Sequence, residues 1–423
     1  MSWLTTPPTA RQFSRVAVVG LLAVGLAAAG CTKKTDSPGA GGKLAAGPGV
    51  TDTTIKLGVL TDLSGPYAPL EKAVAQGRAL YWEKQNNTVC NRTVEFVTKD
   101  HGYKVPDATA AYAAVKSDVL ALAELLGSPE IAALKSDINS DQMLTGALSW
   151  SSANIDNPYI VIPGTTYDAD MINGVQWLMD KKGIVKGDKI GHIYVEGEFG
   201  ENGRAGSKVA AAAAGLELKE YKIGATATDL TAQITTAKAD GVKALLITTT
   251  PAQAGSAVGV AVAQGLEVPI VASGPSFSGT LLTGAAKAAV EKNMYITTSI
   301  AAFSSPGAGT AAVKAALTAK FGADLAKSQY GLLGYAQAQI MHTILDTACK
   351  NKDLTRAGLL KAFQSLTEVK TDGVLPTLDY SKIGGIPARS SYILKPNSAT
   401  EGGLDQIADL FTSPTAITYT PKK

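Results

Sequence analysis

Short apolar runs alternate with helical patterns along most of the chain, and this alternation constrains the fold more than any other feature. The first unit, residues 55–85, reads IKLGVLTDLSGPYAPLEKAVAQGRALYWEKQ. It starts with an apolar run typical of a parallel strand that is covered on both faces. A loop follows in which Ser64 is expected to cap the next helix, whose apolar residues recur at helical spacing. Similar units follow, which predicts βαβ units and parallel sheets.

The chain has 423 residues, more than one hydrophobic core usually serves. The units form two series, the second of which starts near residue 165. We therefore predict an α/β fold with two Rossmann-like, doubly wound lobes. Hydrophobic residues make up 45% and charged residues 18%, as in folded proteins, and no run after the N-terminus is long and apolar enough to cross a membrane. Residues 375–380 and 390–394 are expected to be strands near the C-terminus.

Residues 1–30 have the pattern of a secretory signal peptide, with two arginines before an apolar segment too short for a transmembrane helix. This segment ends in LAAAGC, which resembles a bacterial lipobox and predicts that Cys31 is lipidated and becomes the mature N-terminus. Ala28 stands where leucine is usual. The alternative is ordinary cleavage with Cys31 left unmodified. Residues 31–50, rich in Gly, Ala and Pro, are expected to form a flexible tether.

Two further cysteines remain, Cys90 and Cys349. In an exported protein such a pair suggests a disulfide, which would join two distant parts of the chain. The alternative is a pair of inert thiols. The formal net charge of +3 is small for a chain of this length, and it argues against a nucleic-acid partner.

Catalytic and cofactor motifs are missing from the sequence. The three histidines, His101, His192 and His342, lie in separate segments without metal-ligand spacing. The segment around Ser276 reads GPSFSG and lacks the second glycine of a G-x-S-x-G nucleophile elbow. The glycines at 200, 203 and 206 do not form a dinucleotide fingerprint, and no Walker lysine motif occurs. We therefore expect no catalytic residues, no metal and no cofactor.

Small hydroxyl residues and isolated aromatic residues follow several of the expected strands. They are Ser128, Ser149, Trp150, Ser151, Phe199 and Thr250. Ser128 opens a helix, whose positive end is a site for a ligand carboxylate. It is equally explained as a cap of its own helix, Trp150 as a core residue, and Thr250 as an ordinary strand former. The residues by themselves leave these alternatives open.

Five segments together resemble the type I periplasmic solute-binding proteins of ABC transporters, in the branch that binds branched-chain amino acids (leucine, isoleucine and valine) and amides. They are LGVLTDLSGPYAPL, LLGSPE, LSWSS, YVEGEFGENG and GVLPTLDYS. The resemblance extends from about residue 55 to the end. It implies two lobes joined by three crossovers, near residues 164–166, 299–303 and 373–379. Lobe 1 would comprise residues 51–164 with 303–373, and lobe 2 would comprise 165–300 with 379–423.

The resemblance also implies roles for single residues. Ser128 and Ser151 would hold a ligand carboxylate, with backbone amides around Ser149. Tyr67 would lie over the cleft, Phe199 would pack on the ligand, and Thr250 falls where the family often has another aromatic residue. Ser276 is a further expected ligand residue, in a stretch where amino-acid binders tend to have an acid. This chain has none there, and a buried ammonium without a counter-charge is costly, which argues against a free α-amino acid.

The predicted function is that of a lipid-anchored solute-binding protein on the outer face of a bacterial membrane. It would be a monomer that delivers a small carboxylate- or amide-bearing ligand, similar to a branched-chain amino acid, to an ABC importer. One alternative is a sensor of the same fold that signals to a partner. The other is a secreted enzyme, which would need a nucleophile and a base facing each other across the cleft.

Overall fold

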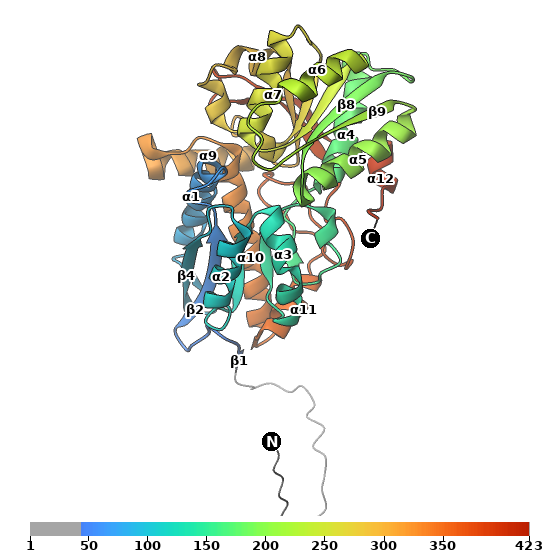
Figure 1. Cartoon of the computed structure of the whole chain (residues 1–423). Coiled ribbons are helices and arrows are strands. Elements are labelled where there is room, and N and C mark those ends of the chain that lie inside the picture. The colour runs from blue at the N-terminus through green and yellow to red at the C-terminus, as the bar shows by residue number, and fades with distance from the viewer. Residues whose placement is uncertain (1–43, 423) are drawn as a thin grey trace, which may run out of the picture. The chain divides into compact units, whose positions relative to one another are not determined.

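The computed structural model describes residues 44–422, which form two lobes stacked one above the other in Figure 1. The predicted signal peptide, residues 1–30, and the predicted lipidation site, Cys31, lie outside the described residues, as does most of the predicted tether. Within the described part of the chain, every helix is too short or too polar to span a bilayer.

Lobe 1 is built on a six-stranded sheet in which only the edge strand β3 runs antiparallel to its neighbour. In spatial order the strands are β3 (Thr88–Val89), β4 (Arg92–Asp100), β2 (Thr54–Thr61), β5 (Ala121–Leu126), β6 (Thr145–Leu148) and β7 (Ile160–Val161). Its helices are α1 (Ala68–Lys84), α2 (Val105–Val115), α3 (Ser128–Ser140), α9 (Ala308–Phe321), α10 (Gln329–Lys350) and α11 (Arg356–Gln364).

Lobe 2 is built on a seven-stranded sheet in which one strand, β14, runs antiparallel to both of its neighbours. In spatial order the strands are β15 (Leu404–Phe411), β14 (Ser391–Pro396), β12 (Met294–Thr298), β11 (Ile270–Ser273), β10 (Ala244–Thr248), β8 (Lys189–Val195) and β9 (Glu217–Ile223). Its helices are α4 (Tyr167–Lys182), α5 (Glu198–Ala214), α6 (Thr231–Asp240), α7 (Pro251–Ala263), α8 (Lys287–Asn293) and α12 (Pro414–Thr418).

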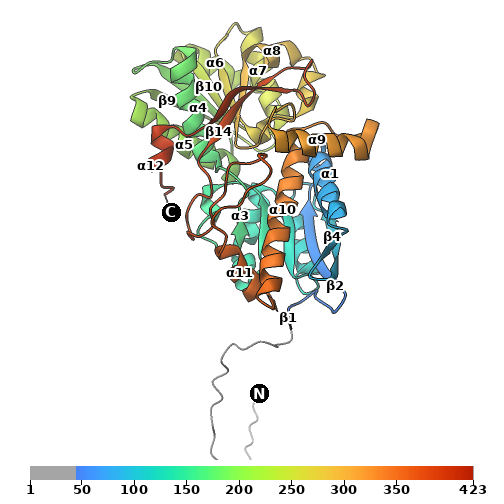
Figure 2. The same cartoon turned by 180° about the vertical axis from the view of Figure 1, so that it is seen from behind.

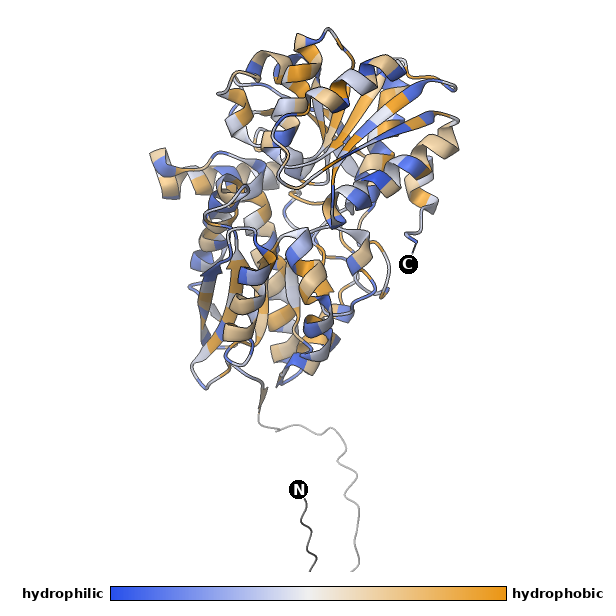
Figure 3. Ribbon diagram, viewed as in Figure 1, coloured by the Kyte–Doolittle hydropathy of each residue, from blue (hydrophilic) through white to orange (hydrophobic). Residues whose placement is uncertain are grey.

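The parallel part of each sheet has the same strand order. The second strand along the chain lies on one side of the first, and the third, fourth and fifth strands follow on the other side of the first. This is the 2-1-3-4-5 order of doubly wound folds. Figure 3 shows hydrophobic residues concentrated in the central strands, where both faces are covered. The predicted fold class is confirmed.

The chain passes between the lobes three times. It crosses after β7, after β12 and after α11, in residues 162–166, 299–307 and 365–390. The strand expected over residues 375–380 does not form, because this stretch makes the third crossing and contributes only a single bridge, between Val369 and Leu378. We propose residues 51–164 with 303–373 as the limits of lobe 1, and residues 165–300 with 379–423 as those of lobe 2.

The first strand lies inside the sheet of lobe 1, between β4 and β5, as expected of a strand covered on both faces, but the helix after it begins later than predicted. All four apolar residues of the β2 run are fully buried: Ile55, Leu57, Val59 and Leu60. The cap of α1 is Tyr67, so the prediction that Ser64 caps this helix is wrong. The Asp62 carboxylate accepts hydrogen bonds from the backbone N–H groups of Gly65 and Tyr67, at 2.5 and 2.8 Å, and thereby holds a turn before the helix starts.

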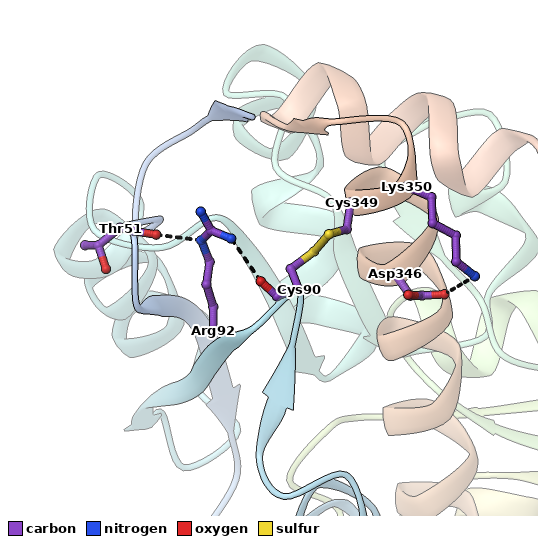
Figure 4. The surroundings of a disulfide bond; sticks show 6 residues. All are labelled: Thr51, Cys90, Arg92, Asp346, Cys349 and Lys350. Carbon is purple, nitrogen blue, oxygen red and sulfur yellow. Dashed lines mark hydrogen bonds and ion pairs between the residues drawn. A yellow bond between two sulfur atoms is a disulfide. The ribbon is translucent and has the colours of Figure 1, made fainter. Parts of the chain in front are cut away.

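The N-terminal end of the described chain is held against lobe 1. Strand β1 (Ala45–Ala46) pairs with β13 (Asp353–Leu354), and Val50 bridges to Ile55. The last residues of the predicted tether are therefore part of the lobe. Figure 4 shows the nearby disulfide between Cys90 and Cys349, whose Cα atoms are 6.0 Å apart. It links the turn before β4 to the end of α10.

Candidate functional site

A cleft lies between the lobes at the carboxyl ends of strands from both sheets, where ligands bind in open α/β folds. Its empty volume is about 670 Å³, including the part open to solvent. Lobe 1 contributes the loops after β2, β4, β5 and β6 and the helices α1 and α10. Lobe 2 contributes the first turns of α4 and α5, the segment at Pro275 and the end of β12.

The lining of the cleft is mostly apolar and aromatic. Its aromatic residues are Tyr67, Tyr103, Trp150, Tyr167, Phe199 and Tyr330. Its aliphatic residues are Leu70, Val74, Leu126, Leu148, Ile300 and Leu333. Among the described residues that line this cleft, none is arginine, lysine or histidine. An anionic ligand would therefore be held by neutral hydrogen-bond donors.

Such donors gather where α3 begins. Ser128 is the first residue of this helix, and its Oγ lies 2.7 Å from the Oγ of Ser149, which is fully buried behind it. The Tyr167 hydroxyl lies close to Ser128, and burial raises the pKa of Tyr167 to about 12, so this hydroxyl keeps its proton. The positive end of the α3 dipole points to the same place. This corner is suited to a carboxylate.

Two pairs of aromatic rings stand around this corner. The ring centroids of Tyr167 and Phe199 are 4.8 Å apart in an edge-on arrangement, and those of Tyr67 and Tyr103 are also 4.8 Å apart. The first pair belongs to lobe 2 and the second to lobe 1. A ligand in the cleft would therefore have aromatic surface on both sides.

Two acidic side chains also line the cleft. Asp170 of α4 accepts a hydrogen bond from the Ser391 hydroxyl at 2.5 Å, and burial raises its pKa well above the usual range. Glu71 of α1 pairs with Arg78, which also pairs with Glu124. Burial and the neighbouring Glu124 raise the pKa of Glu71, against the opposing effect of Arg78.

Four of the eight residues predicted to bind ligand line the cleft: Tyr67, Ser128, Trp150 and Phe199. The other four do not. Ser149 supports Ser128 from behind, and Ser151 accepts a hydrogen bond from the backbone of Ala153. Thr250 forms a capping box with Gln253 at the start of α7, and the Ser276 hydroxyl accepts from the Thr249 backbone at 3.1 Å. The hydroxyl groups of Ser151, Thr250 and Ser276 thus all accept hydrogen bonds from backbone N–H groups.

Sequence reasoning missed Tyr103, Tyr167, Tyr330 and the two acids. Glu71 and Asp170 lie in the first turns of α1 and α4, where acidic residues are common because they stabilise the helix dipole. Their position therefore carried no signal for a site. Tyr330 belongs to α10, which is far from the rest of the site in sequence.

A serine–histidine pair occurs in lobe 2, where Ser207 Oγ lies 2.8 Å from His192 Nδ1. Both residues are fully buried, and the other ring nitrogen of His192 is 2.9 Å from the Thr248 hydroxyl. Burial lowers the pKa of His192 to about 3, so the ring is neutral. This pair is a core hydrogen-bond network and does not line the cleft. Residues 44–422 also contain no group of His, Cys, Asp and Glu side chains arranged to hold a metal ion.

Two doubly wound lobes, three crossovers and an apolar cleft between them define a two-lobed binding protein of the α/β class. A periplasmic binding protein family model matches residues 54–401, and the chain belongs to this family. A search of curated proteins found no match.

Solved structures agree with this assignment. The fatty acid ABC transporter substrate-binding protein from Thermomonospora curvata is 40% identical, with a TM-score of 0.86 over 89% of this chain and 97% of that one. A branched-chain amino acid ABC transporter protein from Thermus thermophilus with bound valine is 19% identical, with a TM-score of 0.75 over 87% and 98%. A solute-binding protein from R. palustris in complex with 4-hydroxybenzoate is 18% identical, with a TM-score of 0.74 over 85% and 97%. The last two share the fold.

The predicted family is thus confirmed. The protein is a substrate-binding protein of the ABC transporter type for a small ligand, and membership of the family implies a location outside the cytoplasm. Partnership with an ABC permease is expected for this family.

Proposed function

We propose that the cleft binds a small carboxylic acid with a largely apolar body, and that the protein delivers this acid to an ABC permease. The observation that carries the proposal is the lining of the cleft, which is aromatic and aliphatic except for a few polar groups. Burial of an apolar ligand body there is favourable by roughly 25 cal/mol per Å². The hydroxyl group of Ser128, at the start of α3, and that of Tyr167, which lies close to it, are suited to the carboxylate.

Similarity to the Thermomonospora curvata protein supports this ligand class, because that protein is described as a fatty acid transporter component and is 40% identical. Ligand binding would close the two lobes, as in other two-lobed receptors. Ligand held by one lobe gains contacts with the other lobe only when the lobes are close, so binding shifts the equilibrium toward the closed form.

A branched-chain amino acid, the ligand type expected from the sequence, is a second candidate. The missing acid at residues 274–276 argues against it, but Asp170 and Glu71 line the cleft and could face an α-ammonium group. Burial raises the pKa of both carboxyl groups, which favours their neutral forms and weakens this candidate relative to the first.

Calorimetry on protein freed of bound ligand by unfolding and refolding tests the proposal. The ligands are octanoate, decanoate, benzoate, leucine and valine. We expect an apolar acid to bind with micromolar affinity or better, and Ser128→Ala to weaken this binding about tenfold or more, since a hydrogen bond to a charged group contributes about 1.5–3 kcal/mol. Thr250→Ala is the matched control, because Thr250 caps α7 and does not line the cleft. Binding of leucine or valine alone would refute the proposal in favour of the second candidate.

We also propose that Cys31 carries a lipid that anchors the protein to the outer face of the membrane, as the lipobox-like LAAAGC segment suggests. Cys31→Ser should then move the protein from the membrane fraction to the soluble fraction. A variant that remains in the membrane fraction would contradict lipid anchoring without affecting the ligand proposal.

We propose further that the protein acts as a monomer and binds its ligand without catalysis. The buried position of the Ser207 and His192 pair supports the latter, because neither side chain lines the cleft. Turnover of a bound ester or amide would instead indicate the enzyme alternative, and an adjacent gene for a kinase would favour the sensor.

A further inference from the structure

One wall of the cleft is formed by α1 and α10, which run side by side in Figure 2. Two residues that these helices contribute to the cleft lining carry a buried polar atom without a hydrogen-bond partner: Oε2 of Glu71 and the hydroxyl oxygen of Tyr330. Glu71 is fully buried from solvent and Tyr330 nearly so. Buried polar atoms in native proteins are nearly always paired, so each atom without a partner requires an explanation.

The charged neighbours of Glu71 explain why one of its oxygens stays unpaired. Arg78 is shared between two carboxylates, with Nη2 3.4 Å from Glu71 Oε1 and Nη1 bonded to Glu124 Oε2. Its donors are therefore directed at only one oxygen of each acid. The Thr61 hydroxyl lies near Glu71 but also has no partner at hydrogen-bonding geometry. Glu124 Oε1, close to Glu71, is unpaired as well, but of these three residues only Glu71 lines the cleft.

We propose that Glu71 forms a second polar subsite of the cleft, which binds a hydroxyl group carried by the ligand away from its carboxylate. This inference rests on the proposed function and narrows the ligand class to hydroxylated apolar carboxylic acids. The carboxylate would lie at Ser128, and the hydroxyl would lie at the wall formed by α1 and α10.

A hydroxyl fits this subsite better than other ligand groups. A methylene would leave Glu71 Oε2 unpaired, and a second carboxylate would place a further negative charge beside Glu71 and Glu124. An ammonium requires an ionised partner and would lie close to Arg78. Because burial and Glu124 raise the pKa of Glu71, its protonated form is favoured, and a hydroxyl pairs with a carboxyl group in either form.

The test compares octanoate with 2-, 3- and 8-hydroxyoctanoate by calorimetry on the full mature protein. We expect at least one hydroxy acid to bind about tenfold more tightly than octanoate, which corresponds to one added hydrogen bond to a charged or acidic group. Glu71→Met should remove this preference while octanoate affinity is kept or improved. Glu71→Gln, the milder change, keeps a polar group that can pair with a hydroxyl and should therefore reduce the preference less than Glu71→Met.

Glu124→Gln is the matched control. This variant removes the other carboxyl group that pairs with Arg78. Because Glu124 does not line the cleft, the preference for the hydroxy acid should persist. If octanoate binds and no hydroxy acid binds more tightly, the subsite is refuted and the proposed function stands. If a preference exists but both Glu71 variants keep it, the subsite at Glu71 is also refuted. If none of the acids binds, the proposed function itself fails.

Discussion

Glu130 is a buried carboxyl group at the start of α3 whose two oxygens have no partner in another side chain. Burial, with a contribution from Asp62, raises its pKa to about 7 from an ordinary 4.5. The folded protein therefore holds this proton more tightly than the unfolded chain. The stabilising effect is complete below about pH 4.5 and is lost as the pH rises to about 7.

Glu130→Gln should remove this pH dependence. We expect the variant to be more stable than the parent above pH 7, by an amount on the order of 3 kcal/mol, and to show a flatter profile between the two pKa values. Urea unfolding at pH 4.5 and pH 7.5 measures the difference. Asp107→Asn, at an exposed position in the first turn of α2, serves as control. Equal pH profiles for the parent and Glu130→Gln would contradict the prediction.

At the scale of elements, the close crossing of α1 and α10 depends on glycine. A Cβ atom added to Gly77 would lie 2.0 Å from the carbonyl oxygen of Gly331, and one added to Gly334 would lie 2.0 Å from that of Val74. The backbones of the two helices are thus in direct contact. This contact sets the position of the wall that carries Glu71 and Tyr330.

Gly77→Ala should therefore destabilise the protein by about 1–3 kcal/mol, because the helices must move apart, even though alanine is the better helix former. Gly259→Ala in α7 is the matched control, since its added Cβ meets nothing closer than 3.7 Å. The control should be neutral or stabilised by up to about 1 kcal/mol. Urea midpoints compare the two, and equal stability of both variants would exclude overpacking at Gly77.

At the scale of the whole molecule, hydrogen bonds outside the cleft join the lobes. The short helix η1 (Ser152–Asn154) follows β6 in lobe 1 and meets α5 in lobe 2. Asn154 Nδ2 donates to Glu198 Oε1 at 2.8 Å, and Asn202 Nδ2 donates to Ser152 Oγ at 2.8 Å. None of these four side chains lines the cleft. They contribute to closure rather than to ligand contact.

Asn154→Ala should shift the free protein toward a more open form and speed ligand release about tenfold, as expected for the loss of one hydrogen bond to a carboxylate. Small-angle scattering measures the first effect and stopped-flow measures the second. Asn157→Ala is the control, because Asn157 donates to Lys135 within lobe 1. The same radius of gyration and release rate in both variants would show that the bond to Glu198 does not hold the lobes together.

Local patterns in the sequence were sufficient for the fold and part of the site. The alternation of apolar strands and amphipathic helices depends on neighbours in sequence, and so do strand ends that carry a hydroxyl or an aromatic residue. Tyr67, Ser128, Trp150 and Phe199 stand at such ends, and all four line the cleft. The antiparallel strand β15 was missed, because a solvent-facing edge strand has only a weak apolar pattern.

Tertiary structure decided the rest. Glu71 and Tyr330 share one wall only because α1 and α10 pack together across more than half of the chain. Thr250 and Ser276 lie near strand ends, yet their hydroxyls are engaged by backbone N–H groups and do not line the cleft. The sequence by itself determined most of the segments that form strands and helices, since those preferences are local. Which side chains meet in the cleft depends on contacts between segments far apart in the chain, and these exist only in the folded protein.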